Sequence, residues 1–252
     1  MHTPFQDRLT SDEVLIGAET VLGAPAIIEL YGALDLDFAW VDFEHQNGSP
    51  YDTQTIEQFV RTAELADTEL LIRPPSANRH IIAKMLDAGA RTMLFPHVET
   101  KSDVEDILAE THYDRTDGGG NRKLGKGRAN QWGVLGTPDL AAADRDVCVG
   151  VMIENQQAIT NIDEIVAVDG LDFVFVGPWD FSQALGHPFE FDHPTVKKSM
   201  NNVQQACAAA GVPWGTYAVE EDRIAQAKNA GCQILLVGDE LKAVIDTYQS
   251  VE

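Results

Sequence analysis

Residues 147–154 read VCVGVMIE, and residues 171–180 read LDFVFVGPWD. Each contains a nearly continuous apolar run rich in Val, Ile and Phe, at residues 147–153 and 171–177, and ends in a carboxylic acid. Such runs are typical of strands in a parallel sheet, where both faces of the strand are buried. Six further runs of this kind bring the predicted strands to eight, and they cover residues 13–18, 38–43, 69–73, 91–96, 212–218 and 232–238.

Helix-like stretches separate these strands, among them residues 53–66, 78–88, 194–210 and 221–230. The last three are followed at once by glycine, a common signal of a helix C-terminus. Eight strands alternating with helices in 252 residues predict the α/β class and a (β/α)8 TIM barrel that occupies residues 1–252 as a single domain. A doubly wound open sheet is the alternative, but no GxGxxG motif follows the first strand.

The charge of the chain excludes several classes of partner. Eighteen Lys and Arg residues against 40 Asp and Glu residues give a net charge of -22. Such a surface repels nucleic acid and anionic membranes. The acidity is spread along the whole chain, which favours a salt-adapted protein over an ordinary acidic enzyme.

The sequence contains no predicted signal peptide and no apolar run of the roughly 18 residues that a membrane helix needs. We therefore expect no membrane attachment and a cytoplasmic location. Three cysteines, Cys148, Cys207 and Cys232, form no CxxC pair and are expected to be reduced thiols in the core.

One segment, residues 112–133, interrupts the alternation of strands and helices. It contains six glycines and five basic residues in an otherwise acidic chain. It lacks the GxxxxGK[ST] pattern of a nucleotide-binding loop. Two interpretations remain open: a basic loop near an anionic substrate or a subunit contact, and a solvated loop without a function.

Ionisable residues follow five consecutive predicted strands. Active sites of barrel enzymes are built at the C-terminal ends of the strands, so these side chains should meet at one mouth. They are Glu44 and His45, Arg73, His97, Glu154 and Asp180.

Glu154 and Asp180 should end neighbouring strands, about 5 Å apart. Two carboxylates this close repel each other unless a proton or a cation lies between them, and oxygen ligands suit Mg²⁺ or Mn²⁺. An acid/base pair would look the same in sequence, but Arg73 and His45 nearby favour the metal. No lysine ends a strand, which disfavours a Schiff-base aldolase and favours metal-assisted enolisation.

Five stretches together resemble the metal-dependent HpcH/HpaI aldolase/citrate lyase family, in particular its short pyruvate-forming aldolases. The resemblance runs from about residue 13 to residue 240, and its most specific part is the pair formed by Glu154 and Asp180. The stretches are DFAWVDFEH (37–45), IRP (72–74), MLDAGARTMLFPHVET (85–100), VMIEN (151–155) and GPWDFSQALG (177–186).

The resemblance implies a barrel enzyme, often a hexamer built as a trimer of swapped dimers, that reversibly cleaves 2-keto-3-deoxy or 4-hydroxy-2-keto acids to pyruvate and an aldehyde. It implies that Glu154 and Asp180 hold a divalent metal, Mg²⁺ or Mn²⁺ with Co²⁺ as a further candidate, which chelates the keto acid and its enolate. Arg73 would stabilise the enolate oxygen. His45 would assist proton transfer with Asp87, supplied by a neighbouring subunit.

The resemblance also implies that a few residues contact the substrate, and the chain departs from the family pattern at several of them. Met152 stands where the family usually has glutamine, Trp179 replaces a smaller residue and should narrow the pocket, and His97 replaces an apolar or amide residue. These departures keep two alternatives open, a decarboxylase or hydrolase using the same enolate and a catalytically weakened barrel subunit. The expected substrate contacts are Met152, Gly177, Pro178, Trp179 and His97.

Several other polar and aromatic residues are expected to have structural roles. Asp42 should be a hydrogen-bonded carboxylate and not a catalyst. Trp40, Trp132 and Trp214 should be packing residues. His187 and His193 lie in a proline-containing turn, so we expect them on the surface. The pair loosely resembles metal ligands but lacks the helical i, i+4 spacing, which disfavours a second metal site.

Overall fold

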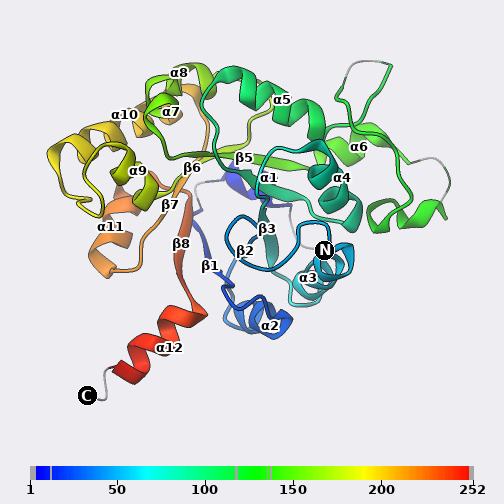
Figure 1. Ribbon diagram of the computed structural model, residues 1–252, viewed down its shortest axis with the longest axis horizontal. Coiled ribbons are helices and arrows are strands. Elements are labelled where there is room, and N and C mark those ends of the chain that lie inside the picture. Colours follow the sequence, from blue (N-terminus) through cyan, green and yellow to red (C-terminus); the bar gives the residue numbers. More distant parts are fainter. Residues whose placement is uncertain (1–3, 12, 117–118, 135, 137, 250–252) are drawn as a thin grey trace.

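The computed structural model describes residues 4–11, 13–116, 119–134, 136 and 138–249. Its centre is a closed barrel of eight parallel strands in sequential order, with β1 paired to both β2 and β8 (Figure 1). The predicted (β/α)8 barrel is therefore confirmed. The strands are β1 (Leu15–Glu19), β2 (Phe38–Asp42), β3 (Glu69–Arg73), β4 (Thr92–Phe95), β5 (Cys148–Ile153), β6 (Phe173–Val176), β7 (Trp214–Tyr217) and β8 (Ile234–Asp239).

Helices surround the barrel and connect successive strands (Figure 1). Two of the predicted helix-ending glycines, Gly89 and Gly211, adopt the left-handed conformation that glycine accepts without strain. The helices are α1 (Phe5–Leu9), α2 (Pro25–Ala33), α3 (Thr53–Leu65), α4 (Arg79–Ala88), α5 (Lys101–Thr111), α6 (Leu140–Arg145), α7 (Gln156–Thr160), α8 (Ile162–Ile165), α9 (Pro178–Ala184), α10 (Pro194–Ala210), α11 (Glu221–Asn229) and α12 (Glu240–Gln249), with a 3-10 helix at Arg128–Gly133.

The barrel interior is filled by apolar side chains, and α1 closes one end of it. Phe5 of α1 meets the rings of Phe38 and Phe173 edge to face, with ring centroids 5.8 and 6.2 Å apart. Two glycines make this packing possible. A Cβ atom added at Gly150 would lie 2.2 Å from the ring of Phe173, and one added at Gly17 would lie 2.4 Å from that of Phe38. Because α1 closes the N-terminal ends of the strands, the open mouth is at their C-terminal ends.

The glycine-rich segment is held to the rest of the chain by ion pairs. Arg122 donates to Asp87 at the end of α4, with 2.8 Å between Nη2 and Oδ1, and its guanidinium stacks on the ring of Tyr113. Other ion pairs of the segment are Arg115–Asp144, Lys123–Asp114 and Arg128–Glu64. Four of its five basic side chains therefore already face carboxylates of the same chain.

The three tryptophans predicted to pack differ in their surroundings. Trp40 and Trp214 are buried, as expected. The prediction is wrong for Trp132, which is 54% exposed. It lies in a backbone turn with positive φ at Gln131 and Trp132. A turn that projects its tryptophan outward cannot bury it against the same chain.

The last helix, α12, extends away from the barrel (Figure 1). Its first residue, Glu240, is buried and accepts hydrogen bonds from the backbone N–H groups of Val21 and Leu22 and from the hydroxyl of Tyr31. No helix among the described residues is long and apolar enough to cross a membrane.

Candidate active site

The mouth of the barrel is organised by an ion pair between neighbouring strands. Asp42 and Arg73 are register partners at the C-terminal ends of β2 and β3. Arg73 donates from Nε to Oδ1 and from Nη2 to Oδ2 of Asp42, both at 2.8 Å. Asp42 is fully buried, and it also accepts the backbone N–H groups of Glu44 and His45. This arrangement confirms that Asp42 is a hydrogen-bonded carboxylate, as expected.

The pairing with Asp42 leaves Nη1 of the guanidinium facing the other residues of the mouth. Nη1 of Arg73 lies 3.2 Å from Oε2 of Glu44 and 3.5 Å from Sδ of Met152. Burial alone would lower the pKa of Arg73, but the hydrogen bonds and charge of Asp42 and the charges of Glu44 and Glu19 outweigh it and raise the pKa. Arg73 is therefore a fixed and permanently charged donor.

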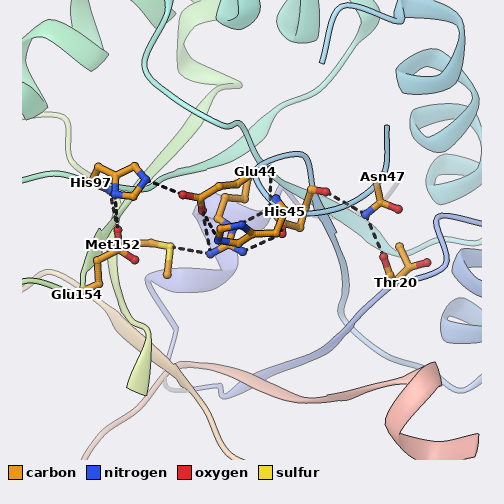
Figure 2. Close-up of polar contacts among 9 residues, drawn as sticks. Thr20, Glu44, His45, Asn47, His97, Met152 and Glu154 are labelled. Atoms are coloured by element: carbon orange, nitrogen blue, oxygen red, sulfur yellow. Dashed lines mark hydrogen bonds and ion pairs between the residues drawn. The ribbon is translucent and has the colours of Figure 1, made fainter. Parts of the chain in front are cut away.

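Figure 2 shows His97 between the carboxylates of Glu44 and Glu154. Its Nε2 lies 2.6 Å from Oε1 of Glu44, and its Nδ1 lies 3.4 Å from Oε1 of Glu154. The backbone of His97 is left-handed, with φ of 59°, and this turn directs its N–H to Oε1 of Glu154 at 2.7 Å. His97 thus contacts both carboxylates and is one of the residues that the sequence predicted at the mouth.

Glu154 has the features of a cation ligand. It is only 7% exposed, and burial raises its pKa; the backbone N–H and the charge of His97 lower that pKa, while Glu44 and Asp180 raise it. Within the described part of the chain, only its Oε1 accepts a hydrogen bond, and a Cβ atom added at Gly177 would lie 4.0 Å from Oε2. A buried carboxylate with one uncommitted oxygen, beside a second carboxylate, fits a divalent cation.

Asp180 lies in the first turn of α9, which begins directly after β6 at Pro178. Asp180 is exposed, and its negative charge raises the pKa of Glu154. Trp179 packs on Tyr217 of β7, with ring centroids 4.9 Å apart. Both residues line a cavity of about 470 Å³ that continues between α10 and α11. Gly177 leaves room for Met152, because a Cβ atom there would come within 3.0 Å of its terminal carbon.

His45 and Asp87, predicted to cooperate in proton transfer, are not brought together within one chain. His45 lies at the mouth, where its exposed ring is 3.8 Å from Oε2 of Glu44. Asp87 lies at the C-terminal end of α4, just before β4 begins, so it is at the opposite end of the barrel, bonded to Arg122.

Sequence reasoning missed a further group of carboxylates at the mouth. Glu19 ends β1 and Asp239 ends β8, one residue beyond the predicted strand end at Gly238. Burial, with the charges of Asp42, Asp239 and Glu240, raises the pKa of Glu19 to about 7, although Arg73 opposes the shift. The other residues of the mouth were located as ionisable residues at strand ends. The same rule would have found Glu19.

The sequence profile of the HpcH/HpaI aldolase/citrate lyase family matches residues 22–247. The chain belongs to this family. Because the match covers nearly the whole barrel, the resemblance carried by the short motifs is confirmed.

Several relatives of the chain carry the names of aldolases. A 5-keto-4-deoxy-D-glucarate aldolase of Shigella boydii is 31% identical over 94% of this chain and 90% of its own. A hydroxypyruvate/pyruvate aldolase of Roseobacter denitrificans is 29% identical over 98% and 94%. The crystal structure of a family member from Burkholderia cenocepacia superposes with a TM-score of 0.89 at 29% identity, covering 98% of both chains.

The raised pKa of Glu19 predicts a specific dependence of stability on pH. Between the ordinary pKa of a glutamate and about 7, the folded state keeps a proton that the unfolded state has released. The stabilisation that Glu19 contributes is therefore fully present below the pKa that this residue has in the unfolded chain. It is lost as the pH rises to about 7. The glutamine of Glu19→Gln cannot titrate. Between pH 4.5 and 8, the free energy of unfolding of the wild type should therefore fall by on the order of 1 kcal/mol more than that of the variant.

Urea unfolding at fixed high salt measures this difference. Glu29→Gln, on the exposed part of α2, is the matched control and should follow the wild type. Parallel curves for wild type and Glu19→Gln would contradict the raised pKa.

Proposed function

We propose that this protein is a metal-dependent aldolase, a carbon–carbon lyase that reversibly cleaves a 2-keto-3-deoxy or 4-hydroxy-2-keto acid to pyruvate and an aldehyde. The observation that carries the proposal is the buried Glu154, with an oxygen uncommitted among the described residues, in the same mouth as a guanidinium fixed by Asp42. The activities named for the relatives support it.

Glu154 and Asp180 would hold the divalent cation, Mg²⁺ or Mn²⁺ with Co²⁺ as a further candidate, because both supply hard oxygen ligands. When bound, such a cation acts as a Lewis acid on the carbonyl group of the keto acid. The neighbouring residues Met152, Gly177, Pro178, Trp179 and His97 would shape the pocket around the substrate.

Arg73 would stabilise the charge that develops during cleavage. When the bond between C3 and C4 of the keto acid breaks, its electron pair moves toward the C2 oxygen and an enolate forms. Nη1 is not bonded to Asp42, and it faces Glu44 and Met152 at the mouth. It would donate to the C2 oxygen by exchanging one of these two contacts. Because Asp42 holds the planar group in place before the reaction, little reorganisation is needed as the charge appears.

His45 would take the proton of the C4 hydroxyl as the aldehyde forms. Its imidazole is exposed at the mouth and is therefore accessible to a bound substrate. Asp87 of the same chain is at the other end of the barrel and cannot reach this histidine. An Asp87 could orient His45 only if it came from a second copy of the chain.

The activity is tested by assaying pyruvate release from a panel of 2-keto-3-deoxy acids, with EDTA and with added Mg²⁺ or Mn²⁺. We expect EDTA to abolish release and either metal to restore it. Arg73→Lys keeps the charge but loses the planar fork, and it should lower kcat by at least about tenfold. Arg79→Lys, an exposed arginine of α4, is the control and should leave kcat unchanged.

The wild type should also exchange the methyl protons of pyruvate with D₂O when metal is present, because the enolate forms from pyruvate alone. A folded, metal-loaded protein that shows neither exchange nor release would refute the aldolase and favour the weakened barrel. Carbon dioxide release, or hydrolysis, without an aldehyde product would indicate the decarboxylase or hydrolase.

We further propose that the protein is a homo-oligomer in which α12 packs on a second copy. Four apolar residues of α12 share one helix face by their spacing, and they are exposed: Leu241, Val244, Ile245 and Tyr248. On the barrel itself, Val237 of β8 and Ile16 of β1 are only partly buried. A hexamer, as a trimer of dimers, is the assembly that we expect from the family resemblance.

Charging this face should disrupt the assembly. Val244→Glu combined with Ile245→Glu should lower the mass measured by sedimentation to that of a smaller species, because two charges cannot be buried unpaired. Ala243→Glu places a charge on the same exposed helix outside the apolar face and should leave the mass unchanged. A wild type that sediments as a monomer in high salt would overturn the proposal.

The acidic surface supports adaptation to high salt, and the three buried, unpaired cysteines suit the reducing cytoplasm. Lowering salt extends the range of charge repulsion from about 3 Å at 1 M to about 10 Å at 0.1 M. With a net charge of -22, the melting temperature should therefore fall when molar KCl is replaced by dilute buffer. A melting temperature that is equal in both solutions would refute salt adaptation.

A further inference from the structure

The loop between α9 and α10 brings two histidines and a glutamate together. Each of His187, Glu190 and His193 offers one ligand atom, and these atoms all lie within 4.8 Å of one another. We propose that this His187–Glu190–His193 trio binds one divalent transition-metal ion of the Zn²⁺ type, at a site formed by other residues than those of the barrel mouth.

The trio is assembled by consecutive turns and not by a helix. The N–H of Glu190 donates to the carbonyl of His187 at 3.0 Å, and the N–H of His193 donates to the carbonyl of Glu190 at 2.9 Å. Ser182 of α9 fixes the start of the loop, because its carbonyl accepts the N–H of His187 and its hydroxyl accepts the N–H of Phe189. Each turn advances the chain by three residues and returns the next ligand to the same side.

The two imidazoles of the trio are stacked on each other. Their ring centroids are 3.4 Å apart and their planes differ by 19°. Two nitrogen ligands about 2.0–2.1 Å from a tetrahedral Zn²⁺ are roughly 3.4 Å from each other, and the ligand atoms of the trio already lie within 4.8 Å of one another. Stacked rings direct their lone pairs side by side, so the rings must rotate and move apart before both nitrogens face one ion. The torsion that rotates a histidine ring is soft.

The chemistry of the ligands selects the class of metal. Two imidazoles and one carboxylate suit Zn²⁺, Co²⁺ or Ni²⁺, whereas Mg²⁺ prefers a shell made of oxygen alone. The adjacent Asp192 is already paired with Lys197 and Arg223, at 2.8 and 3.1 Å, so the trio supplies the ligands without it.

Metal binding would exchange one local interaction for another. Nδ1 of His193 accepts the N–H of Thr195 at 3.3 Å and so caps the N-terminus of α10. If Nδ1 binds the metal, its lone pair is taken; if Nε2 binds, the proton moves to Nδ1. In both cases the capping bond is lost, and the metal joins the end of α9, the helix that carries Asp180, to the start of α10.

The test compares the Zn²⁺ stoichiometry of the full chain with that of a variant carrying His187→Asn and His193→Asn, by calorimetric titration in molar KCl. Asparagine is a good helix cap, so α10 keeps its N-terminal acceptor at position 193 while the trio loses both imidazoles. The double variant should bind one Zn²⁺ fewer per chain. A hundred-fold excess of Zn²⁺ over Kd should raise the melting temperature of the wild type by on the order of 5 °C more than that of the variant.

His80→Asn, which removes an exposed histidine outside the trio, is the matched control and should keep the wild-type stoichiometry. The amide resonance of Thr195 should shift on Zn²⁺ addition in the wild type and in His80→Asn only. If the double variant has a lower melting temperature than the wild type in EDTA, the single variant His187→Asn takes its place in the comparison of Zn²⁺ stoichiometry. Equal stoichiometry in wild type and variant, or an equal loss in the His80→Asn control, would overturn the proposal.

Discussion

The buried ion pair between Asp42 and Arg73 is the interaction on which the mouth of the barrel depends. Removing two charges from water is costly, and the pair offsets this cost with two hydrogen bonds of 2.8 Å and with backbone donors to Asp42. Parallel register places the two residues side by side, so the geometry follows from the barrel itself. One carboxylate thereby orients the guanidinium and shapes the turn that presents His45.

The sequence was sufficient to predict the barrel and most of its mouth. Continuous apolar strands report burial on both faces, and in a parallel barrel every strand ends at the same side, so a polar residue after each strand identifies the site. The same reasoning separated Glu154 and Asp180 from the many surface carboxylates of an acidic chain. Short motifs narrowed this to a family, because Glu154, Asp180 and the residues around them resemble the pattern of that family.

Other features could not be predicted because they depend on contacts distant in sequence or on the backbone. The link from Glu44 through His97 to Glu154 requires a left-handed residue after β4. The ion pair of Arg122 with Asp87 joins residues whose proximity only the folded loop creates. His187 and His193 were expected at the surface, and they are partly exposed there. Helical spacing, the criterion used for metal ligands, could not show that two successive turns bring them into contact.

The closure of the barrel has a consequence for how the chain reaches its folded state. Phe5 and Leu9 seal the interior, and the side chain of Gln233, just before β8, donates to the carbonyls of Leu9 and Ser11. A five-residue helix is unstable alone, so α1 can pack stably only once β8 is in place. Contacts of such long sequence separation make folding slow. On a ribosome, the apolar end of the nascent barrel would therefore stay open until β8 has emerged.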